Sequence, residues 1–277
     1  MREIDLHIHT TASDGTDSPA EVVRRASELG LRAIAITDHD TVTGYAEAFS
    51  AGLDHGIEVV PGIEVSTKYG VAVHILGYDI ENLVPLLAGV VNDRDRRNEK
   101  VAALMAADGL PVTYAAMKQR FGTVIGRPHF GELLIELGLA ADMTDAFARF
   151  VGKGQRYYVP RTTIDIDSSV EAIVASGGVP VLAHPFQYKK NDAELRELIE
   201  RCMDHGLRGM ECRYSGYTPE QSGYLEALAE EYGLLKTGGS DYHGGHKPHI
   251  ALGSGIDGNL EVPYAWLERL KEAAGAR

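Results

Sequence analysis

The chain has 277 residues, of which 44% are hydrophobic and 24% are charged, a composition typical of a folded globular protein. Its formal net charge of −13 at pH 7 argues against a broad cationic surface for long nucleic acid. The apolar runs are too short to cross a bilayer, and a predicted strand starts so close to Met1 that we expect no signal peptide and a cytoplasmic location.

The first part of the chain alternates short apolar strands with helices. Six elements are predicted before residue 80, namely strands over residues 4–7, 32–37, 57–66 and 71–78 and helices over 18–30 and 43–55. Ser18 is a good N-cap residue before Pro19 at the first helical position. The last two strands predict a hairpin in which Gly70 takes the left-handed position of the turn. That register would place Glu64 opposite His74 on the same face.

From residue 81 to 158 the pattern changes to helix after helix, and we predict an inserted helical subdomain that caps the site. The alternation then resumes, with helices over 167–176, 192–205 and 218–232 and strands over 179–183, 209–213 and 235–237. Alternating strands and helices indicate a parallel sheet, and we predict one α/β barrel built from residues 1–80 and 159–277. Cys202 and Cys212 are expected to be reduced core residues in this barrel.

Histidine and carboxylate side chains recur at or near the ends of the predicted strands. His7 and His9 are two apart on a strand and therefore project to the same side. The other candidate ligands follow along the chain: Asp14, His39, Glu64, His74, His184, Asp241 and His243. Because the carboxyl ends of barrel strands meet on one face, we expect these side chains to form a multinuclear metal site. Asp5 shares a face with His7 and is either an acceptor that fixes an imidazole tautomer or an ordinary polar residue at the strand entry.

Five motifs resemble those of the polymerase and histidinol phosphatase (PHP) superfamily of metal-dependent phosphoesterases. They are Asp5-Leu6-His7-Ile8-His9, Thr37-Asp38-His39-Asp40, Gly62-Ile63-Glu64, Ala183-His184-Pro185 and Ser240-Asp241-Tyr242-His243. The resemblance covers residue 5 to about residue 255 and implies a distorted seven-stranded β/α barrel that holds two or three divalent metals.

The resemblance also implies how the candidate ligands are shared among the metals. One ion would be held by His7, His9, Glu64 and Asp241. Glu64 would bridge to a second ion, which His74 and His184 would also hold. Asp14, His39 and His243 would hold a third. All these positions carry suitable ligands, which favours three ions. Manganese is the expected metal, with iron or zinc as alternatives.

Within the superfamily, the chain resembles the branch that removes the 3′-phosphate from nucleoside 3′,5′-bisphosphates and trims short RNAs from the 5′ end. That branch carries a helical insertion after the hairpin, and its substrate groups lie there. The matching candidates in this chain are Arg94, Arg97, Arg127, His129 and Lys153. Arg94 and Arg97 share a helix face and could grip a phosphate together, or form an ordinary solvated face. Lys153 between two glycines suits a phosphate or simply marks a flexible loop.

The implied reaction is hydrolysis of a phosphoester. Bound divalent cations lower the pKa of a bridging water and neutralise the phosphate oxygens while the resulting hydroxide attacks phosphorus. We assign His39, His184 and Asp241 to the catalytic machinery, with His39, His184 or a metal-bound water supplying the proton to the leaving group. The expected partner is a small phosphorylated nucleotide or a short RNA. We expect no long duplex nucleic acid, no membrane and no obligate protein partner.

Three other functions stay open at this point. A histidinol-phosphate phosphatase shares the barrel and the metals but not this insertion. A non-catalytic, metal-stabilised PHP module usually has lost ligands and needs a partner polymerase, and none of the nine ligand positions is lost here. An amidohydrolase would need a carboxylated lysine at a strand end, and none of the strand-end positions identified above is a lysine.

Overall fold

Eight strands form one sheet at the centre of the molecule. The computed structural model describes residues 3–79, 85–122, 125–160 and 164–275, and it describes residues 85–93 by their backbone alone. The strands are β1 (Ile4–Ile8), β2 (Ala33–Ile36), β3 (Glu58–Tyr69), β4 (Val71–Tyr78), β5 (Ile164–Asp165), β6 (Val179–Leu182), β7 (Gly209–Tyr214) and β8 (Leu235–Gly239). All seven predicted strands are present, and the two-residue β5 was not predicted.

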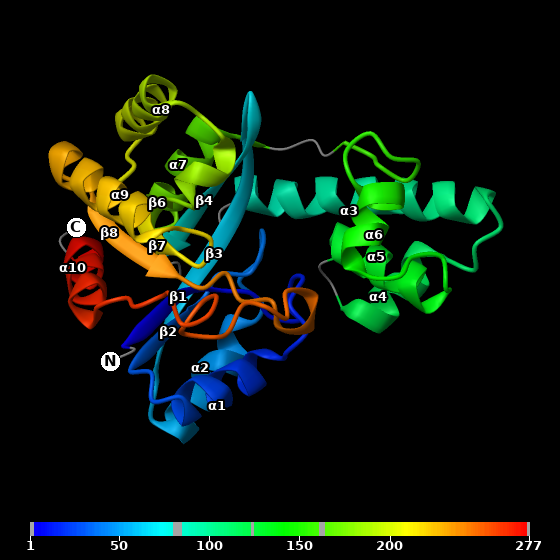
Figure 1. Cartoon of the computed structure of the whole chain (residues 1–277), viewed down its shortest axis with the longest axis horizontal. Coiled ribbons are helices and arrows are strands. Elements are labelled where there is room, and N and C mark those ends of the chain that lie inside the picture. The colour runs from blue at the N-terminus through cyan, green and yellow to red at the C-terminus, as the bar shows by residue number, and fades with distance from the viewer. Residues whose placement is uncertain (1–2, 80–84, 123–124, 161–163, 276–277) are drawn as a thin grey trace.

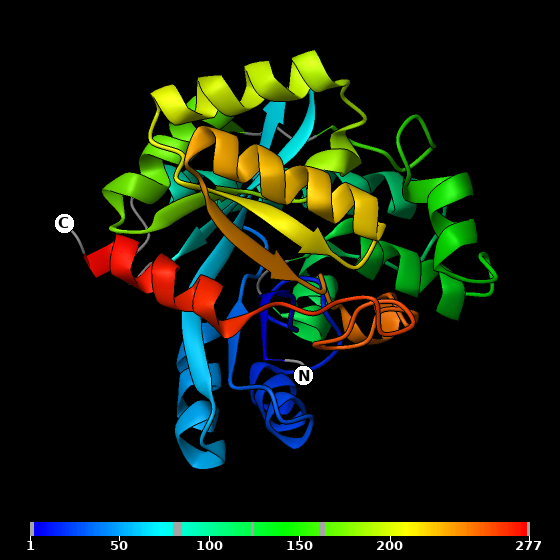
Figure 2. The ribbon, with the colours of Figure 1, turned by 60° about the vertical axis from the view of Figure 1, so that its left-hand side comes forward.

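The sheet curves into a nearly closed barrel (Figures 1 and 2). Its strand order is β1-β2-β3-β4-β6-β7-β8, with β5 paired to β3. Neighbouring strands are parallel except around β4, which is antiparallel to both β3 and β6. The segment after β8 returns to β1, where the Asp241 N–H donates to the His7 carbonyl at 2.8 Å. The predicted distorted α/β barrel is therefore confirmed.

Helices cover the outside of the barrel. They are α1 (Pro19–Glu28), α2 (Tyr45–His55), α7 (Ile166–Ala175), α8 (Asp192–Asp204), α9 (Pro219–Tyr232) and α10 (Tyr264–Gly275). Ser18 caps α1 as predicted, because its hydroxyl accepts from the Glu21 N–H and Pro19 opens the helix. Helix α10 was not predicted; it buries Leu267 and Leu270 against the barrel. No helix among the described residues has both the length and the apolar composition needed to cross a bilayer.

The insertion between β4 and β5 is helical and projects to one side of the barrel (Figure 1). It contains α3 (Pro85–Ala107), α4 (Tyr114–Phe121), α5 (Arg127–Glu136), α6 (Met143–Ala146) and a π-helix (Phe147–Val151). Its helices bury a hydrophobic core of their own around Met105, Phe130 and Leu134. The boundary predicted at residues 80–81 lies outside the described residues. Both cysteines are buried and free, which confirms the prediction for them.

The β3–β4 hairpin differs from the predicted register. His74 pairs with Ser66, and Glu64 pairs with Leu76, so Glu64 and His74 are diagonal neighbours and not directly opposite. The prediction was wrong by two residues because both strands run on to a turn made by Gly70 alone, at φ 70°. A shift of two residues keeps the face of each side chain. The two side chains therefore still meet, with His74 Nδ1 at 2.7 Å from Glu64 Oε1.

Candidate metal centre

The nine candidate ligands converge at the mouth of the barrel. They form four overlapping groups, in each of which one ligand atom per residue lies within 4.8 Å of the others. The groups are His9, Asp14, His39 and His243; His7, Glu64 and His184; His7, His9 and Asp241; and His39, Glu64 and His74. Shared members connect all nine residues into one cluster, although they come from segments spread over most of the chain.

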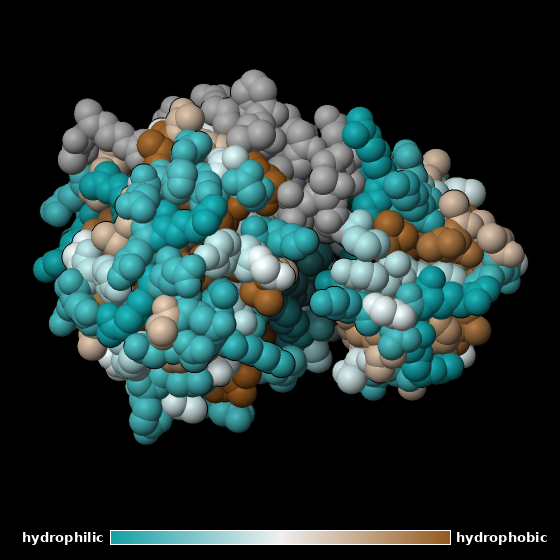
Figure 3. All heavy atoms as spheres, turned by 90° about the horizontal axis from the view of Figure 1, so that it is seen from above, coloured by the Kyte–Doolittle hydropathy of each residue, from teal (hydrophilic) through white to brown (hydrophobic). Residues whose placement is uncertain are grey.

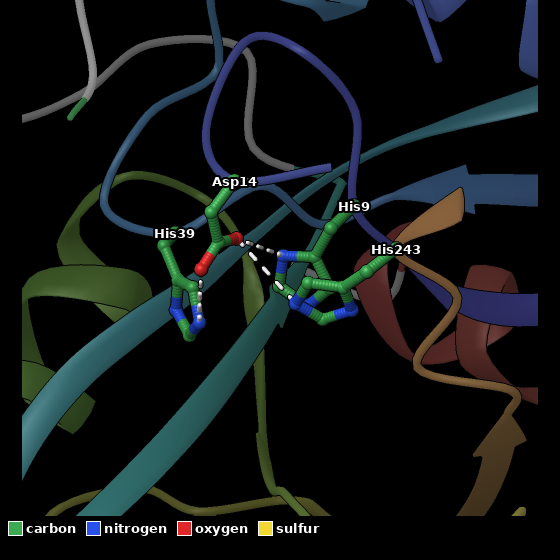
Figure 4. Close-up of side chains that lie close together, drawn as sticks. All are labelled: His9, Asp14, His39 and His243. Atoms are coloured by element: carbon green, nitrogen blue, oxygen red, sulfur yellow. Dashed lines mark ion pairs between the residues drawn. The ribbon is translucent and has the colours of Figure 1, made fainter. Parts of the chain in front are cut away.

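Asp14 lies among three histidine rings on a loop that follows β1 (Figure 4). Its carboxylate oxygens are 3.4 Å from His243 Nε2, 3.7 Å from His9 Nδ1 and 3.9 Å from His39 Nε2. Such separations are long for direct hydrogen bonds and suit ligands that share a cation. Asp38 fixes the loop, because its carboxylate accepts from the backbone N–H and the hydroxyl of Thr10, each at 2.7 Å.

Glu64 lies at the centre of the cluster, and each of its oxygens faces different rings. Oε1 is 2.9 Å from His184 Nε2 and 2.7 Å from His74 Nδ1, whereas Oε2 is 3.0 Å from His39 Nδ1 and 3.2 Å from His9 Nε2. Burial would raise the pKa of this carboxyl, but the surrounding histidines outweigh burial and hold its pKa well below the usual value. The ionised carboxylate can therefore bridge two cations.

Asp241 presents its two oxygens to different partners. Oδ1 faces His9 Nε2 at 3.3 Å and His7 Nε2 at 3.7 Å. Oδ2 accepts from the Tyr214 hydroxyl at 2.7 Å and from Lys247 Nζ at 2.6 Å. Oδ1 is thus left for coordination. The backbone of Asp241 has φ 58°, a conformation that is uncommon outside glycine and that concentrates at functional sites.

The ring nitrogens of the cluster indicate that it binds cations. Buried polar atoms are normally hydrogen-bonded, yet among the described residues no partner meets hydrogen-bond geometry with His7 Nε2, either nitrogen of His9, His39 Nδ1 or His184 Nδ1, although Glu64 Oε2 lies 3.0 Å from His39 Nδ1 and 3.2 Å from His9 Nε2. Burial lowers the pKa of His39 to about 3, so its ring is neutral and offers a lone pair. Burial alone would lower the pKa of His9 too, but Asp241 and Glu64 raise it to about 9. A bound cation would take the place of the proton on His9, and imidazoles beside carboxylates are a donor set that fits Mn, Fe or Zn.

A carboxylate that was not predicted holds the ring of His7 and the backbone of His184. Glu211 on β7 is fully buried; its Oε1 is 2.9 Å from His7 Nδ1, and its Oε2 accepts from the His184 N–H at 2.8 Å. A proton held on Nδ1 leaves His7 Nε2 facing the cluster. Asp5 does not take this role, because its carboxylate accepts from the backbone N–H groups of Ser240 and Gly253. The prediction that Asp5 fixes an imidazole tautomer was therefore wrong. The sequence feature that could have identified Glu211 is a glutamate within a mostly apolar strand.

A cavity of about 300 Å³ opens between the cluster and the insertion. Figure 3 shows the surface narrowing between the barrel and the insertion. Arg94, Arg97 and Arg127 line the cavity beside Asp14 and His39. Arg94 and Arg97 are 3% and 5% exposed, so they do not form a solvated helix face. Arg94 also donates to Asp40, which follows β2, and this buried ion pair ties α3 to the barrel.

The other two candidate substrate residues lie elsewhere. His129 is buried behind the cavity wall, where its Nδ1 accepts from the Gly126 N–H at 2.8 Å. Lys153 is exposed on a turn after the π-helix and does not line the cavity. The cavity wall also contains Pro128, which belongs to the same sequence stretch as Arg127, and residues that the sequence patterns did not single out: Ser66, Met143, Phe147, His246 and Lys247.

Comparison with known proteins agrees with this geometry. A family model described as PHP domain matches residues 5–211. A 5′-3′ exoribonuclease of Haemophilus influenzae is 33% identical over 87% of this chain and 90% of its own length. A 3′,5′-nucleoside bisphosphate phosphatase of Chromobacterium violaceum is 33% identical over 88% of both chains. The solved structure of a candidate metal-dependent phosphoesterase from Bifidobacterium adolescentis superimposes with a TM-score of 0.84 at 31% identity, over 97% of this chain and 95% of that one.

Proposed function

Because this chain belongs to the PHP domain family, we propose that it is a metal-dependent phosphatase that removes the 3′-phosphate from nucleoside 3′,5′-bisphosphates and also degrades short RNA from its 5′ end. One observation carries the proposal: a cluster of nine metal-ligand candidates shares a cavity with three arginines. Histidine and carboxylate ligands suit the cation, and arginines suit phosphate groups. The names of the two relatives supply the substrate classes.

We assign the nine residues to three cations, with manganese as the expected ion. His7, His9, Glu64 and Asp241 would hold one, Glu64 would bridge to a second held by His74 and His184, and Asp14, His39 and His243 would hold the third. Divalent cations at these positions would lower the pKa of water toward neutrality and offset the charge of the phosphate. A neutral His39 suits a ligand better than a proton donor. His184 is a ligand in the same assignment, so a solvent molecule would protonate the leaving oxygen.

The insertion would act as the substrate cap. Arg94 is held in place by Asp40, and its guanidinium borders the cavity close to the metal ligands. The guanidinium of Arg127 lies 5.4 Å from the ring centre of Phe147 and 5.8 Å from that of Tyr158. A cation held between aromatic rings is well placed to bind the phosphate that is not cleaved. That contact would orient the reacting phosphate through remote binding energy.

The proposal is tested by measuring phosphate release with added Mn²⁺ from three substrates: a nucleoside 3′,5′-bisphosphate, histidinol phosphate and a 5′-phosphorylated oligoribonucleotide. We expect release from the bisphosphate, digestion of the oligoribonucleotide and little release from histidinol phosphate. Chelation should abolish both activities. Hydrolysis of histidinol phosphate alone would assign the chain to that other phosphatase, and no metal-dependent hydrolysis of any phosphoester would reject the proposal.

The role of Arg127 has its own test. Arg127→Ala should raise KM for a 3′,5′-bisphosphate far more than for a 3′-monophosphate, because only the former carries the second phosphate. Arg149→Ala is a matched control on the same subdomain, since Arg149 is exposed and pairs with Asp145. Equal effects of Arg127→Ala on both substrates would remove it from the phosphate site.

A further inference from the structure

We propose that Pro128, Met143 and Phe147 form a platform on which a nucleobase stacks; this inference rests on the proposed function. These three side chains, called the base platform here, line the cavity that also contains Asp14 and His39. Each is half-buried and turns apolar surface into a space that is otherwise bordered mainly by charged and polar groups. The cavity wall thus combines metal-ligand candidates with apolar side chains.

The local fold brings the base platform together. Met143 opens α6, and Phe147 opens the π-helix that follows, so the two are four residues apart and share one side of a continuous helical segment. Short π-helical segments are frequent at functional sites. Pro128 lies on the neighbouring α5, in the first turn.

Two contacts fix the base platform from behind. The sulfur of Met143 packs on Gly131 of α5, where an added Cβ would lie only 2.7 Å from it, so a larger residue there would displace this side chain. The guanidinium of Arg127 lies 5.4 Å from the ring centre of Phe147. A cation at that distance restrains the ring and places a phosphate-binding group next to it. Met143 and Phe147 therefore each have a contact outside the platform that restrains them.

The combination of groups identifies the ligand. Arginines bind the phosphate groups of a ligand. An aromatic ring and a thioether favour contact with a flat, polarisable part of a ligand, such as a nucleobase. A ligand that satisfies both within a cavity of about 300 Å³ is a single nucleotide unit. Proline, methionine and phenylalanine side chains offer no strong hydrogen-bond donor or acceptor to a base edge. The base platform should therefore accept all four bases with similar affinity.

The test compares a nucleoside 3′,5′-bisphosphate with the baseless 1-O-methylribose 3,5-bisphosphate. Stacking on an aromatic side chain contributes about 1–3 kcal/mol per base, so Phe147→Ala should raise KM for the nucleotide by about 5- to 150-fold. We expect kcat to stay within about twofold, because Phe147 is not a metal-ligand candidate. KM for the baseless substrate should rise much less than KM for the nucleotide, because the variant removes only one of the two rings beside Arg127. Phe147→Trp should keep the wild-type KM for the nucleotide.

Matched variants separate stacking from folding. Phe150→Ala alters the same π-helix, but Phe150 packs on Tyr157 and does not line the cavity. This variant should therefore keep the wild-type KM for both substrates. Phe147→Leu keeps apolar bulk in the core of the insertion but lacks the ring, and it should lose the preference for the nucleotide even if the alanine variant fails to fold. Equal KM changes on both substrates, or none with Phe147→Leu, would overturn the base platform.

Binding measurements keep the two proposals distinguishable. If the wild-type protein hydrolyses neither substrate, the proposed function fails, and calorimetric affinities of the same two compounds then decide on the base platform. Tighter binding of the nucleotide that is lost in Phe147→Leu would support it, and equal affinities in the wild type would reject it.

Discussion

Replacing Glu211 with glutamine should weaken metal binding although Glu211 faces away from the cavity. Its two oxygens serve two donors, His7 Nδ1 at 2.9 Å and the His184 N–H at 2.8 Å. Glutamine has one acceptor oxygen and one NH₂ group, so one of these donors would meet another donor. Loss of a carboxylate behind a ligating histidine typically costs about 10- to 100-fold in metal affinity, or about 1.4–2.7 kcal/mol.

The affinity of metal-stripped protein for Mn²⁺ can be measured by competition with a chelating dye, in parallel with phosphatase activity against free Mn²⁺. For Glu211→Gln we expect the activity curve to shift to about 10- to 100-fold higher Mn²⁺ and to approach the wild-type plateau. Glu28→Gln is a suitable control, because Glu28 is 61% exposed on α1, where it pairs with Arg24 far from the cluster. Unchanged Mn²⁺ affinity in Glu211→Gln would refute its role in holding the two histidines.

Three further predictions concern the surroundings of the site. Asp40→Asn leaves the buried Arg94 without its counter-charge and should lower the free energy of unfolding by about 3 kcal/mol in urea titration; a loss below about 1 kcal/mol would contradict the buried pair. Burial lowers the pKa of His129 from 6.5 to about 4, so between these values the unfolded chain binds a proton that the folded chain excludes. Stability should thus fall by about 3 kcal/mol as the pH drops from 6.5 to 4, and His129→Gln should flatten this part of the curve; an unchanged slope would refute it. Tyr214→Phe removes one of two donors to Asp241 Oδ2 and should reduce Mn²⁺ affinity less than Glu211→Gln does; a larger loss would show that the tyrosine does more than hold this oxygen.

Local sequence patterns were sufficient for the barrel and for the convergence of the ligand candidates. The spacing of two at the end of β1 predicted that His7 and His9 project together, and their ring centres lie 5.2 Å apart although His9 is just beyond the strand. The meeting of parallel strand ends on one face predicted that distant residues such as His184 and Asp241 join them. Both inferences depend on regular backbone geometry, which short segments encode well.

Features that depend on packing across the barrel could not be read from neighbouring residues. Glu211 reaches His7 from 204 positions away, whereas the adjacent Asp5 turns to backbone amides. His129 and Lys153 follow the insertion's phosphate-binding pattern, but the helix rotation and an exposed turn direct them away from the cavity. Which side of a short helix lines a cavity depends on how the helix packs, so the sequence alone did not identify Met143 and Phe147.

The most direct test of the metal centre is anomalous diffraction from crystals grown with Mn²⁺, recorded on both sides of the manganese absorption edge. We expect three anomalous peaks at the barrel mouth, each within about 2.0–2.3 Å of histidine nitrogens or carboxylate oxygens of the nine residues. Peaks only at surface carboxylates, or none near Glu64, would contradict a catalytic metal centre in this protein.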